Sequence, residues 1–457
     1  MDELIKRAVD KFLELNEDKP IRVVTHNDTD GITSGSIMCK ALIRAGRKFV
    51  ISYVKQLDEE TLKEISKEKY ETILFTDLGS GYLKLIKKFL VNKCVFIFDH
   101  HEIEDGGGDN TKEIIHVNPK LINEENYSFA SGAGVVYLFC KSLNKENVDL
   151  SYLALIGAIG DIQDLQEGVN KIILDDAVSN NKIEVKRGLK MFGYQSRAIH
   201  KILEYSDDPY IPGISGNENG AINFLNEIGI KVLDENGKYR KMNSLNDEEM
   251  QKLVAGIIIK RFSEDKPEDV LGDLYLLKDE DENSLIKDAR EFSTVLNCCG
   301  RLDSFSTGIG LCFGNKKIRE EAEELLKSYR LEIIKGLNYF YENKDSFVTN
   351  DNFMIVNAKD KIRDTLIGTL IGIVSRHNEF RGKILIGMVY RDDDIKISVR
   401  CDNNLDVDLR EILMNIIGDE GIVGGHKMAC GGLISKDKEE MFMSKALEVL
   451  SSLKLAS

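Results

Sequence analysis

Short, continuous apolar runs alternate with helical patterns through the first 160 residues, and this alternation restricts the fold more than any other feature of the chain. The runs are IRVVT, FVISYV, TILFT, CVFIF and EIIHV, at residues 21–25, 49–54, 72–76, 94–98 and 113–117. They are rich in Val, Ile and Phe without polar alternation, which is typical of strands buried on both faces of a parallel sheet. Helical patterns occupy 32–46, 58–69, 82–90, 130–144 and 149–160. Since strand–helix alternation implies right-handed crossovers, we predict an α/β fold with a doubly wound parallel sheet.

Two further regions follow along the chain. In the first of them, helical periodicity dominates, at 222–229, 247–262, 285–298 and 316–341. An α/β pattern then returns, with strands expected at 353–358, 383–391 and 395–400 and helices at 362–376, 406–416 and 437–453. We therefore expect a doubly wound domain over 1–190, a largely helical connecting region over 191–345, and a smaller α/β domain over 346–457.

Composition narrows the class of protein and its location. The 457 residues include 62 Lys+Arg and 77 Asp+Glu, which gives a formal charge of −15. This charge argues against a uniformly basic surface for duplex binding, but it does not exclude a local basic channel. No apolar run approaches the ~20 residues of a transmembrane helix, and the first residues lack a signal-peptide core. The eight Cys form no CxxC pair, as expected of reduced thiols. We expect a cytoplasmic protein with no membrane partner.

Acidic and imidazole side chains follow three of the predicted strands and one helix. In chain order they are His26, Asp28, Asp30, Asp77, Asp99, His100, His101 and Asp161. Because the carboxyl ends of parallel strands meet at one edge of a sheet, we expect these side chains to lie together. A helix cap is the better explanation for Asp77 taken alone. It fails for the whole set, because so many like charges destabilise a fold unless a cation neutralises them.

Mixed His and Asp ligands predict the kind of cation. They suit Mn²⁺, Fe²⁺, Co²⁺ or Zn²⁺ better than Ca²⁺, which prefers oxygen ligands alone. Two ions about 3.5–4 Å apart can share a bridging carboxylate. Six protein groups with bridging solvent would fill such a site, namely His26, Asp28, Asp30, Asp77, His100 and Asp161. His101 is then available to contact a substrate oxygen.

Four of these segments resemble the motifs of a known family. THNDTDG (25–31), TDLGSG (76–81), FDHHE (98–102) and GAIGDIQD (157–164) resemble the four motifs of the DHH phosphoesterase superfamily. SVR (398–400) and GGHKMACGG (424–432) resemble its companion DHHA1 substrate-binding domain. The combination is similar to archaeal RecJ-like nucleases, and NCCGRLDSFSTGIGLC (297–312) resembles an Asn-x-x-Gly-Arg segment of RecJ-type proteins.

The resemblance implies a role for each residue of the metal set. One ion would be bound by His26 and Asp28, the other by Asp30, His100 and Asp161, and Asp77 would bridge them. His101 would contact the scissile phosphate, and Asp99 would orient an imidazole. The two cations would be Mn²⁺ by preference, with Mg²⁺ or Co²⁺ as alternatives.

The resemblance also implies substrate contacts in the C-terminal region and a cleft between the two α/β domains. Arg400 would hold a phosphate or a terminal nucleotide, and Arg301 is a further candidate for a backbone contact. The glycine-rich loop would contribute Gly424, Gly425, His426 and Lys427. The glycine-rich loop could instead be an ordinary hairpin with tight turns. Arg400 could instead be a strand residue exposed at the surface.

The activity implied is an exonuclease that cuts single-stranded DNA or RNA to nucleoside 5′-monophosphates. One alternative is a phosphodiesterase or phosphatase acting on short oligonucleotides or cyclic dinucleotides. Another is a replication factor with a mainly structural role, because a related subunit of the eukaryotic replicative helicase shares this fold and archaeal relatives can bind the GINS complex. The intact motifs disfavour a purely structural role. Polarity, DNA or RNA preference and homo-oligomer formation stay open.

Overall fold

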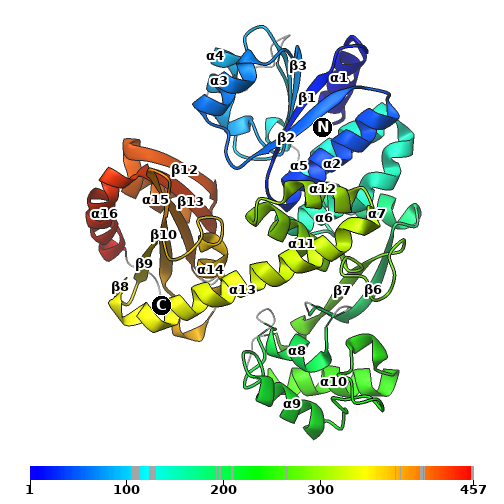
Figure 1. The fold of residues 1–457 in the computed structure, drawn as a ribbon, viewed down its shortest axis with the longest axis vertical. Coiled ribbons are helices and arrows are strands. Elements are labelled where there is room, and N and C mark those ends of the chain that lie inside the picture. The colour runs from blue at the N-terminus through cyan, green and yellow to red at the C-terminus, as the bar shows by residue number, and fades with distance from the viewer. Residues whose placement is uncertain are drawn as a thin grey trace. The chain divides into compact units, whose positions relative to one another are not determined.

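The computed structural model forms two compact units, Met1–Leu326 and Lys327–Ser457, and each is described by itself (Figure 1). The residues described are 1–104, 114–122, 130–191, 193–194, 197–206, 210–262, 266–375, 377–380, 382–401, 405 and 407–453. Every helix within these ranges is too short or too polar to cross a membrane.

A five-stranded parallel sheet lies at the centre of the N-terminal part of the first unit. Its strands are β1 (Ile21–His26), β2 (Phe49–Val54), β3 (Thr72–Thr76), β4 (Cys94–Phe98) and β5 (Ile114–Val117), in the order β2-β1-β3-β4-β5. The four strands predicted first are confirmed to within one residue. The fifth is confirmed over 114–117, and Glu113 lies outside the described residues. The strand order reverses between β1 and β3, which is where doubly wound sheets bind their ligands.

Helices cover both faces of this sheet, as the doubly wound prediction requires. One face carries α3 (Glu59–Lys67) and α4 (Leu83–Phe89), and the other carries α1 (Asp2–Leu13), α2 (Thr29–Arg44) and α5 (Gly132–Leu143) (Figure 1). Successive side chains of a strand point to opposite faces. Accordingly Phe75 packs in the cluster under α3 and α4, whereas Phe96 and Phe98 contact the rings of Phe12 and Phe139 on the other face.

The rest of the first unit is mainly helical. Two helices, α6 (Ser151–Gly160) and α7 (Gly168–Ser179), lead to the antiparallel pair β6 (Ile183–Leu189) and β7 (Leu271–Leu277). Between those strands α8 (Ile199–Glu204), α9 (Glu218–Glu227) and α10 (Asp247–Lys260) surround a core of their own. Then come α11 (Ala289–Arg301), α12 (Phe305–Cys312) and the start of α13 (Arg319–Asn343). The sequence analysis missed both β6 and β7, and the three-domain boundaries stay a prediction.

The second unit is built on a six-stranded mixed sheet. Its order is β12-β13-β11-β10-β9-β8, from β8 (Val348–Thr349), β9 (Phe353–Lys359), β10 (Ile384–Arg391), β11 (Asp394–Cys401), β12 (Gly421–His426) and β13 (Ala429–Ser435). The helices α15 (Leu409–Ile417) and α16 (Glu439–Ser452) pack on one face. Helix α14 (Ile367–Val374) covers the other, so close that a Cβ on Gly387 would lie 2.5 Å from Ile371 Cγ1. The three predicted strands are confirmed, and the glycine-rich loop forms the β12–β13 hairpin.

Candidate metal centre

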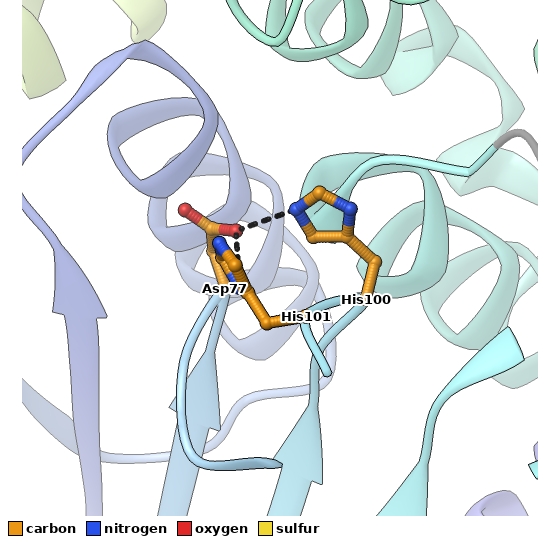
Figure 2. A group of neighbouring side chains, drawn as sticks. All are labelled: Asp77, His100 and His101. Atoms are coloured by element: carbon orange, nitrogen blue, oxygen red, sulfur yellow. Dashed lines mark ion pairs between the residues drawn. The ribbon is translucent and has the colours of Figure 1, made fainter. Parts of the chain in front are cut away.

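The loops that follow β3 and β4 bring Asp77, His100 and His101 together at the rim of the parallel sheet (Figure 2). Asp77 Oδ1 lies 3.5 Å from His100 Nε2 and 4.0 Å from His101 Nδ1. Asp77 has a φ of 61°, a left-handed conformation that Asp tolerates better than most residues. Its side chain caps no helix, so the capping interpretation of this residue is wrong.

The end of β1 and the turn after it carry two further candidate ligands, His26 and Asp28, and α2 begins directly behind them. Asp28 is the N-cap residue of α2, and its Oδ1 accepts a hydrogen bond of 2.9 Å from the Gly31 amide. Its Oδ2 lies 3.0 Å from His26 Nδ1. Asp28 therefore combines a cap with a ligand position. A Cβ on Gly31 would lie only 2.3 Å from the His26 carbonyl oxygen, so this turn needs glycine.

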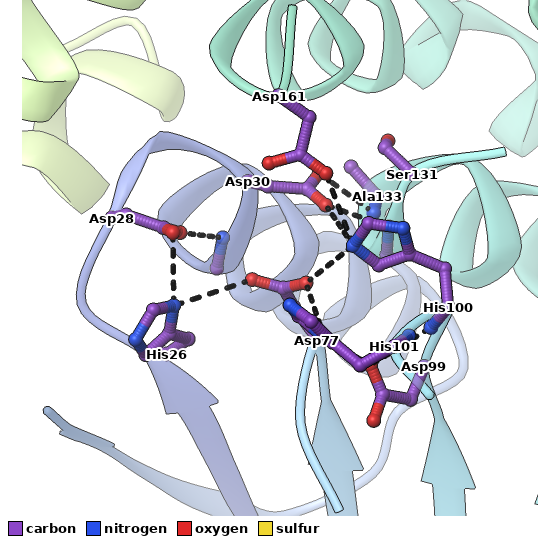
Figure 3. A network of polar contacts seen from close by, with 12 residues as sticks. His26, Asp28, Asp30, Asp77, Asp99, His100, His101, Ser131, Ala133 and Asp161 are labelled. Atoms are coloured by element: carbon purple, nitrogen blue, oxygen red, sulfur yellow. Dashed lines mark hydrogen bonds and ion pairs between the residues drawn. The ribbon is translucent and has the colours of Figure 1, made fainter. Parts of the chain in front are cut away.

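Asp77 lies between two groups of side chains and presents one oxygen to each (Figure 3). In the first group, Asp77 Oδ2 is 3.6 Å from His26 Nδ1. In the second, Asp77 Oδ1 faces His100, whose Nε2 is 3.0 Å from Asp161 Oδ2 and 3.7 Å from Asp30 Oδ2. Ligand atoms of His26, Asp28 and Asp77, and those of Asp30, His100 and Asp161, lie close enough to share one ion in each group. The structure thus brings all six predicted ligands together.

The polar atoms in this cluster fit bound cations. Asp77 is 1% exposed, yet neither of its oxygens has a hydrogen-bond partner among the described residues, and the nearest imidazole nitrogens, of His26 and His100, are 3.6 and 3.5 Å away. Buried polar atoms without partners are costly, so such a group points to a ligand. Bonds of about 2.1 Å to one ion place neighbouring ligand atoms about 3.0–3.4 Å apart. The separations of 3.0–3.7 Å found within the two groups are close to these values.

Proximity of the carboxylates shifts the pKa values in the cluster. Burial alone would lower the pKa of His26, but Asp28 and Asp77 outweigh it and raise that pKa well above its ordinary value. Burial opposes the charge of Asp28, yet the His26 pair lowers the pKa of Asp28. Burial together with Asp77 and Asp161 raises the pKa of Asp30 well above its usual range. Protons thus balance negative charge here, and a cation would displace them.

Asp30 is fixed by the start of α5. Its Oδ2 accepts a hydrogen bond of 2.6 Å from the Gly132 amide, and its Oδ1 accepts one of 2.9 Å from the Ala133 amide. Two glycines allow this close approach. A Cβ on Gly132 would lie 2.6 Å from Asp77 Oδ1, and one on Gly157 would lie 2.4 Å from Asp30 Oδ1. The sequence analysis gave no role to Gly132, Ala133 or Gly157, because only the fold places them against the candidate ligands.

Asp99 organises the loop that carries both histidines. Its Oδ1 lies 2.7 Å from His101 Nδ1 and accepts hydrogen bonds from the amides of His100 and His101 at 2.8 and 3.2 Å. Its Oδ2 accepts a bond of 2.8 Å from the Ser80 amide. Burial opposes ionisation of Asp99, but the His101 ion pair outweighs it and lowers the pKa of Asp99. The contact with His101 is the one expected of a residue that orients an imidazole.

A polar network behind this loop was also missed from the sequence. Asn118 directly follows β5 and is fully buried, and its Nδ2 donates to the His101 carbonyl oxygen at 2.9 Å and to Ser80 Oγ at 2.8 Å. Ser80 Oγ is in turn 2.8 Å from His116 Nε2. Burial lowers the pKa of His116 to about 4. Asn118 stands at the same sheet rim as the ligands, and that position was a usable signal.

Helix α11 packs against the β1–α2 loop and brings Arg301 close to Asp28. Asn27 Nδ2 donates to the Gly300 carbonyl oxygen at 3.3 Å, and a Cβ on Gly300 would lie 1.8 Å from the Asn27 oxygen. The positive charge of Arg301 helps to lower the pKa of Asp28, after the larger effect of His26. The Asn-x-x-Gly-Arg segment is therefore part of the wall of the candidate centre.

The remaining predicted contacts belong to the second unit. Arg400 lies on β11, and its Nη1 donates to the carbonyl oxygens of Val399 and Cys430 at 2.8 and 3.0 Å. It pairs in register with Ala429, which pairs in turn with His426, so the hairpin adjoins it. The backbone of Gly424, Gly425 and His426 forms β12, Lys427 lies in the turn, and the His426 side chain is outside the description. Their substrate role and the cleft stay predictions.

Comparison with known proteins gives two family matches and one curated relative. Residues 20–160 match the DHH family, N-terminal domain, and residues 191–274 match the DHH-CID domain. The second match covers the helices between β6 and β7. An uncharacterized protein of Methanocaldococcus jannaschii is 29% identical over 462 residues, covering 98% of this chain and 97% of the relative.

Solved structures resemble the chain in fold. RecJ in complex with Mn²⁺ from Thermus thermophilus is 14% identical with a TM-score of 0.62, covering 99% of this chain and 55% of RecJ. CDC45 from Entamoeba histolytica is 13% identical with a TM-score of 0.66, covering 99% of this chain and 98% of CDC45. This chain therefore spans about half the length of the Thermus protein. The two family matches identify a DHH-family N-terminal domain at residues 20–160 and a DHH-CID domain at residues 191–274, and the solved structures show that the chain has a RecJ-like fold.

Proposed function

We propose that the chain is a two-cation phosphodiesterase that degrades single-stranded DNA or RNA from one end to nucleoside 5′-monophosphates. The observation that carries this proposal is the position of Asp77, which offers one buried oxygen to each of two ligand groups. A shared carboxylate between two ion sites is the arrangement by which paired cations act on a phosphodiester.

The two ligand groups divide the predicted set as follows. His26 and Asp28 would hold one ion, Asp30, His100 and Asp161 would hold the other, and Asp77 would contribute to both. We propose Mn²⁺ as the preferred ion, with Mg²⁺ or Co²⁺ as alternatives, because two imidazoles and four carboxylates suit a borderline cation. When bound, the ions would neutralise the phosphodiester and lower the pKa of a shared water toward neutrality.

His101 is the residue we assign to the scissile phosphate. Burial lowers the pKa of its imidazole, but Asp99 outweighs that effect and raises it, so the protonated ring is favoured. A ring fixed at 2.7 Å by Asp99 can donate a hydrogen bond to a phosphate oxygen on which charge develops. Asp99 is accordingly a positioning residue, since it acts through His101.

Arg400 and the hairpin loop are the residues we assign to the substrate grip. A guanidinium pairs bidentately with a phosphate, and the two carbonyl contacts of Arg400 Nη1 hold its plane in place. Gly424, Gly425, His426 and Lys427 would contact a phosphate or terminal nucleotide through backbone amides and positive charge. Arg301 would contact the backbone near the Asp28 group.

Digestion of end-labelled single strands tests the proposal directly. DNA and RNA 20-mers are incubated with Mn²⁺, Mg²⁺ or Co²⁺, and the products are resolved over time. We expect mononucleotides from the first time points, and the label that is released early gives the polarity. Internal cuts, or no cleavage in any of these cations, would contradict an exonuclease. Faster turnover of dinucleotides by orders of magnitude would favour the short-oligonucleotide alternative.

Two Asp→Asn variants supply a matched control. Asp28 caps α2 and Asp58 caps α3, where Asp58 Oδ1 accepts a bond of 2.8 Å from the Thr61 amide. Asparagine caps helices as well as aspartate does. Asp28→Asn should therefore abolish cleavage without loss of the cap, whereas Asp58→Asn should leave cleavage unchanged.

A structural role in replication is the second candidate, and the almost complete mutual coverage with CDC45 favours it. The partner under this candidate is the GINS complex. A chain that co-purifies with GINS, while the wild type shows no cleavage and Asp77→Asn changes nothing measurable, would favour this role.

A further inference from the structure

Ile162 is an exposed and strained residue that directly follows the ligand Asp161. Its φ is 57°, and the residue is 86% exposed. A β-branched residue rarely adopts a left-handed backbone, because the branched Cβ then crowds the following peptide. Strained residues of this kind concentrate at functional sites.

Hydrogen bonds at the end of α6 hold Ile162 in this conformation. The Ile162 amide donates to the Ile159 carbonyl oxygen at 3.1 Å, and the Gln163 amide donates to that of Ala158 at 2.9 Å. These two bonds define a Schellman motif, in which Ile162 occupies the position that normally carries glycine. The same motif fixes Asp161, whose Oδ2 faces His100.

Other helix ends in the chain show which residues this position ordinarily receives. The described residues include five further helices, α2, α7, α9, α11 and α12, that end with the same pair of hydrogen bonds. The corresponding residues, all with positive φ, are Gly46, Asn181, Gly229, Asp303 and Gly314. Gly, Asn and Asp tolerate this conformation at little cost. Only the helix end at the candidate metal centre carries a β-branched residue among these six.

Packing does not account for Ile162. A residue that is 86% exposed gains little from burial, so it cannot offset the strain of its own backbone. Glycine at this position would keep both hydrogen bonds and remove the strain. The isoleucine therefore carries a backbone strain that its own burial does not offset.

We propose that Ile162 is a substrate contact, whose side chain packs against the base that flanks the scissile phosphate. This inference rests on the proposed function. The Cα of Ile162 is one peptide, about 3.8 Å, from that of Asp161, so a strand whose phosphate reached the ions would lie within range of this residue. The base is the largest apolar surface of a nucleotide, and contact with its face does not depend on sequence. Aliphatic side chains make such contacts with bases in other nucleic-acid-binding proteins.

The test is the coupling between the side chain and the base. Affinities for single-stranded 12-mers with phosphorothioate linkages are measured by fluorescence anisotropy in the presence of Mn²⁺. One strand carries a base at every position. Each of the others has a single abasic residue, at the first or second position from one of its ends. The wild type should lose affinity about fivefold or more for at least one abasic strand. Ile162→Gly should bind that strand and the complete strand equally, and Ile162→Leu should discriminate as the wild type does.

Stability provides the second readout. Ile162→Gly should raise the midpoint of thermal unfolding by about 2 °C, because glycine relieves the left-handed strain. Asn181→Gly, at the same position of α7, is the matched control and should leave strand affinity unchanged.

The outcomes separate this inference from the proposed function. If the wild type digests single strands and Ile162→Gly still discriminates against the abasic strand, the base contact is wrong and the phosphodiesterase stands. If the wild type neither binds nor digests strands, both fail.

Discussion

Asp77 is the residue whose replacement tests the shared-carboxylate arrangement most sharply. Its two oxygens face different ligand groups, at 3.6 Å from His26 Nδ1 and 3.5 Å from His100 Nε2. Asp77→Asn therefore removes a charged ligand from both ion sites, whereas Asp28→Asn removes one from a single site. We expect Mn²⁺ to stabilise the wild type against unfolding, Asp28→Asn by about half as much, and Asp77→Asn hardly at all.

The magnitude follows from ligand linkage. At a free Mn²⁺ concentration about 100 times the dissociation constant, each occupied site adds about 2.7 kcal/mol, and two add about 5.4 kcal/mol. An unfolding entropy of about 2.1 cal/mol/K per residue over the unit Met1–Leu326 amounts to about 0.7 kcal/mol/K. The melting temperature should rise by about 8 °C for the wild type and about 4 °C for Asp28→Asn.

Differential scanning calorimetry of each variant, with and without Mn²⁺, measures these shifts. Each shift is taken from the metal-free midpoint of the same variant, so that a change in intrinsic stability cancels. Asp58→Asn is the control and should keep the full shift. A shift for Asp77→Asn as large as that of the wild type, or one equal to that of Asp28→Asn, would refute the reasoning.

Three further predictions concern the surroundings of the centre. Gly300→Ala would place a Cβ 1.8 Å from the Asn27 carbonyl oxygen, so the β1–α2 loop must move. Isothermal titration calorimetry should then show Mn²⁺ binding that is at least about tenfold weaker, and unchanged affinity would contradict this. Neighbouring carboxylates raise the pKa values of His26 and His100 against the effect of burial, which favours the protonated form of both rings. Mn²⁺ binding should then release protons and strengthen as pH rises, and a binding enthalpy that is the same in buffers of different ionisation enthalpy would argue against it. The pKa of His116 falls from 6.5 to about 4 on burial, so the unfolded chain binds a proton in that window while the folded chain does not. Stability should fall by up to about 3 kcal/mol as pH drops from 6.5 to 4, and His116→Asn should lose this part of the pH dependence; superimposable profiles would rule it out.

The strands of the parallel sheet could be predicted because both of their faces are buried. A run such as TILFT has no polar side, so its boundaries coincide with those of β3. The paired strands β6 and β7 were missed for the opposite reason. They lie more than 80 residues apart in the chain, and the middle of β6 is exposed, so the pairing leaves no local pattern.

The grouping of the candidate ligands could be predicted because parallel strands end at one edge, which brings residues from distant positions in the sequence close together. The residues that hold those ligands could not. Gly132 and Gly157 matter because a Cβ would displace Asp77 or Asp30, and Asn118 matters because its amide reaches His101. Such contacts depend on side-chain packing between distant segments. The strain at Ile162 is likewise a backbone property that no residue pattern shows.

Electron paramagnetic resonance of the Mn²⁺-loaded chain tests the paired-cation centre most directly. We predict two Mn²⁺ per chain at saturation and the spectrum of a spin-coupled pair, as expected for ions about 3.5–4 Å apart that share a carboxylate. Asp77→Asn should eliminate the coupled signal. Saturation at one ion per chain, or the six-line spectrum of isolated Mn²⁺ at full loading, would contradict the account.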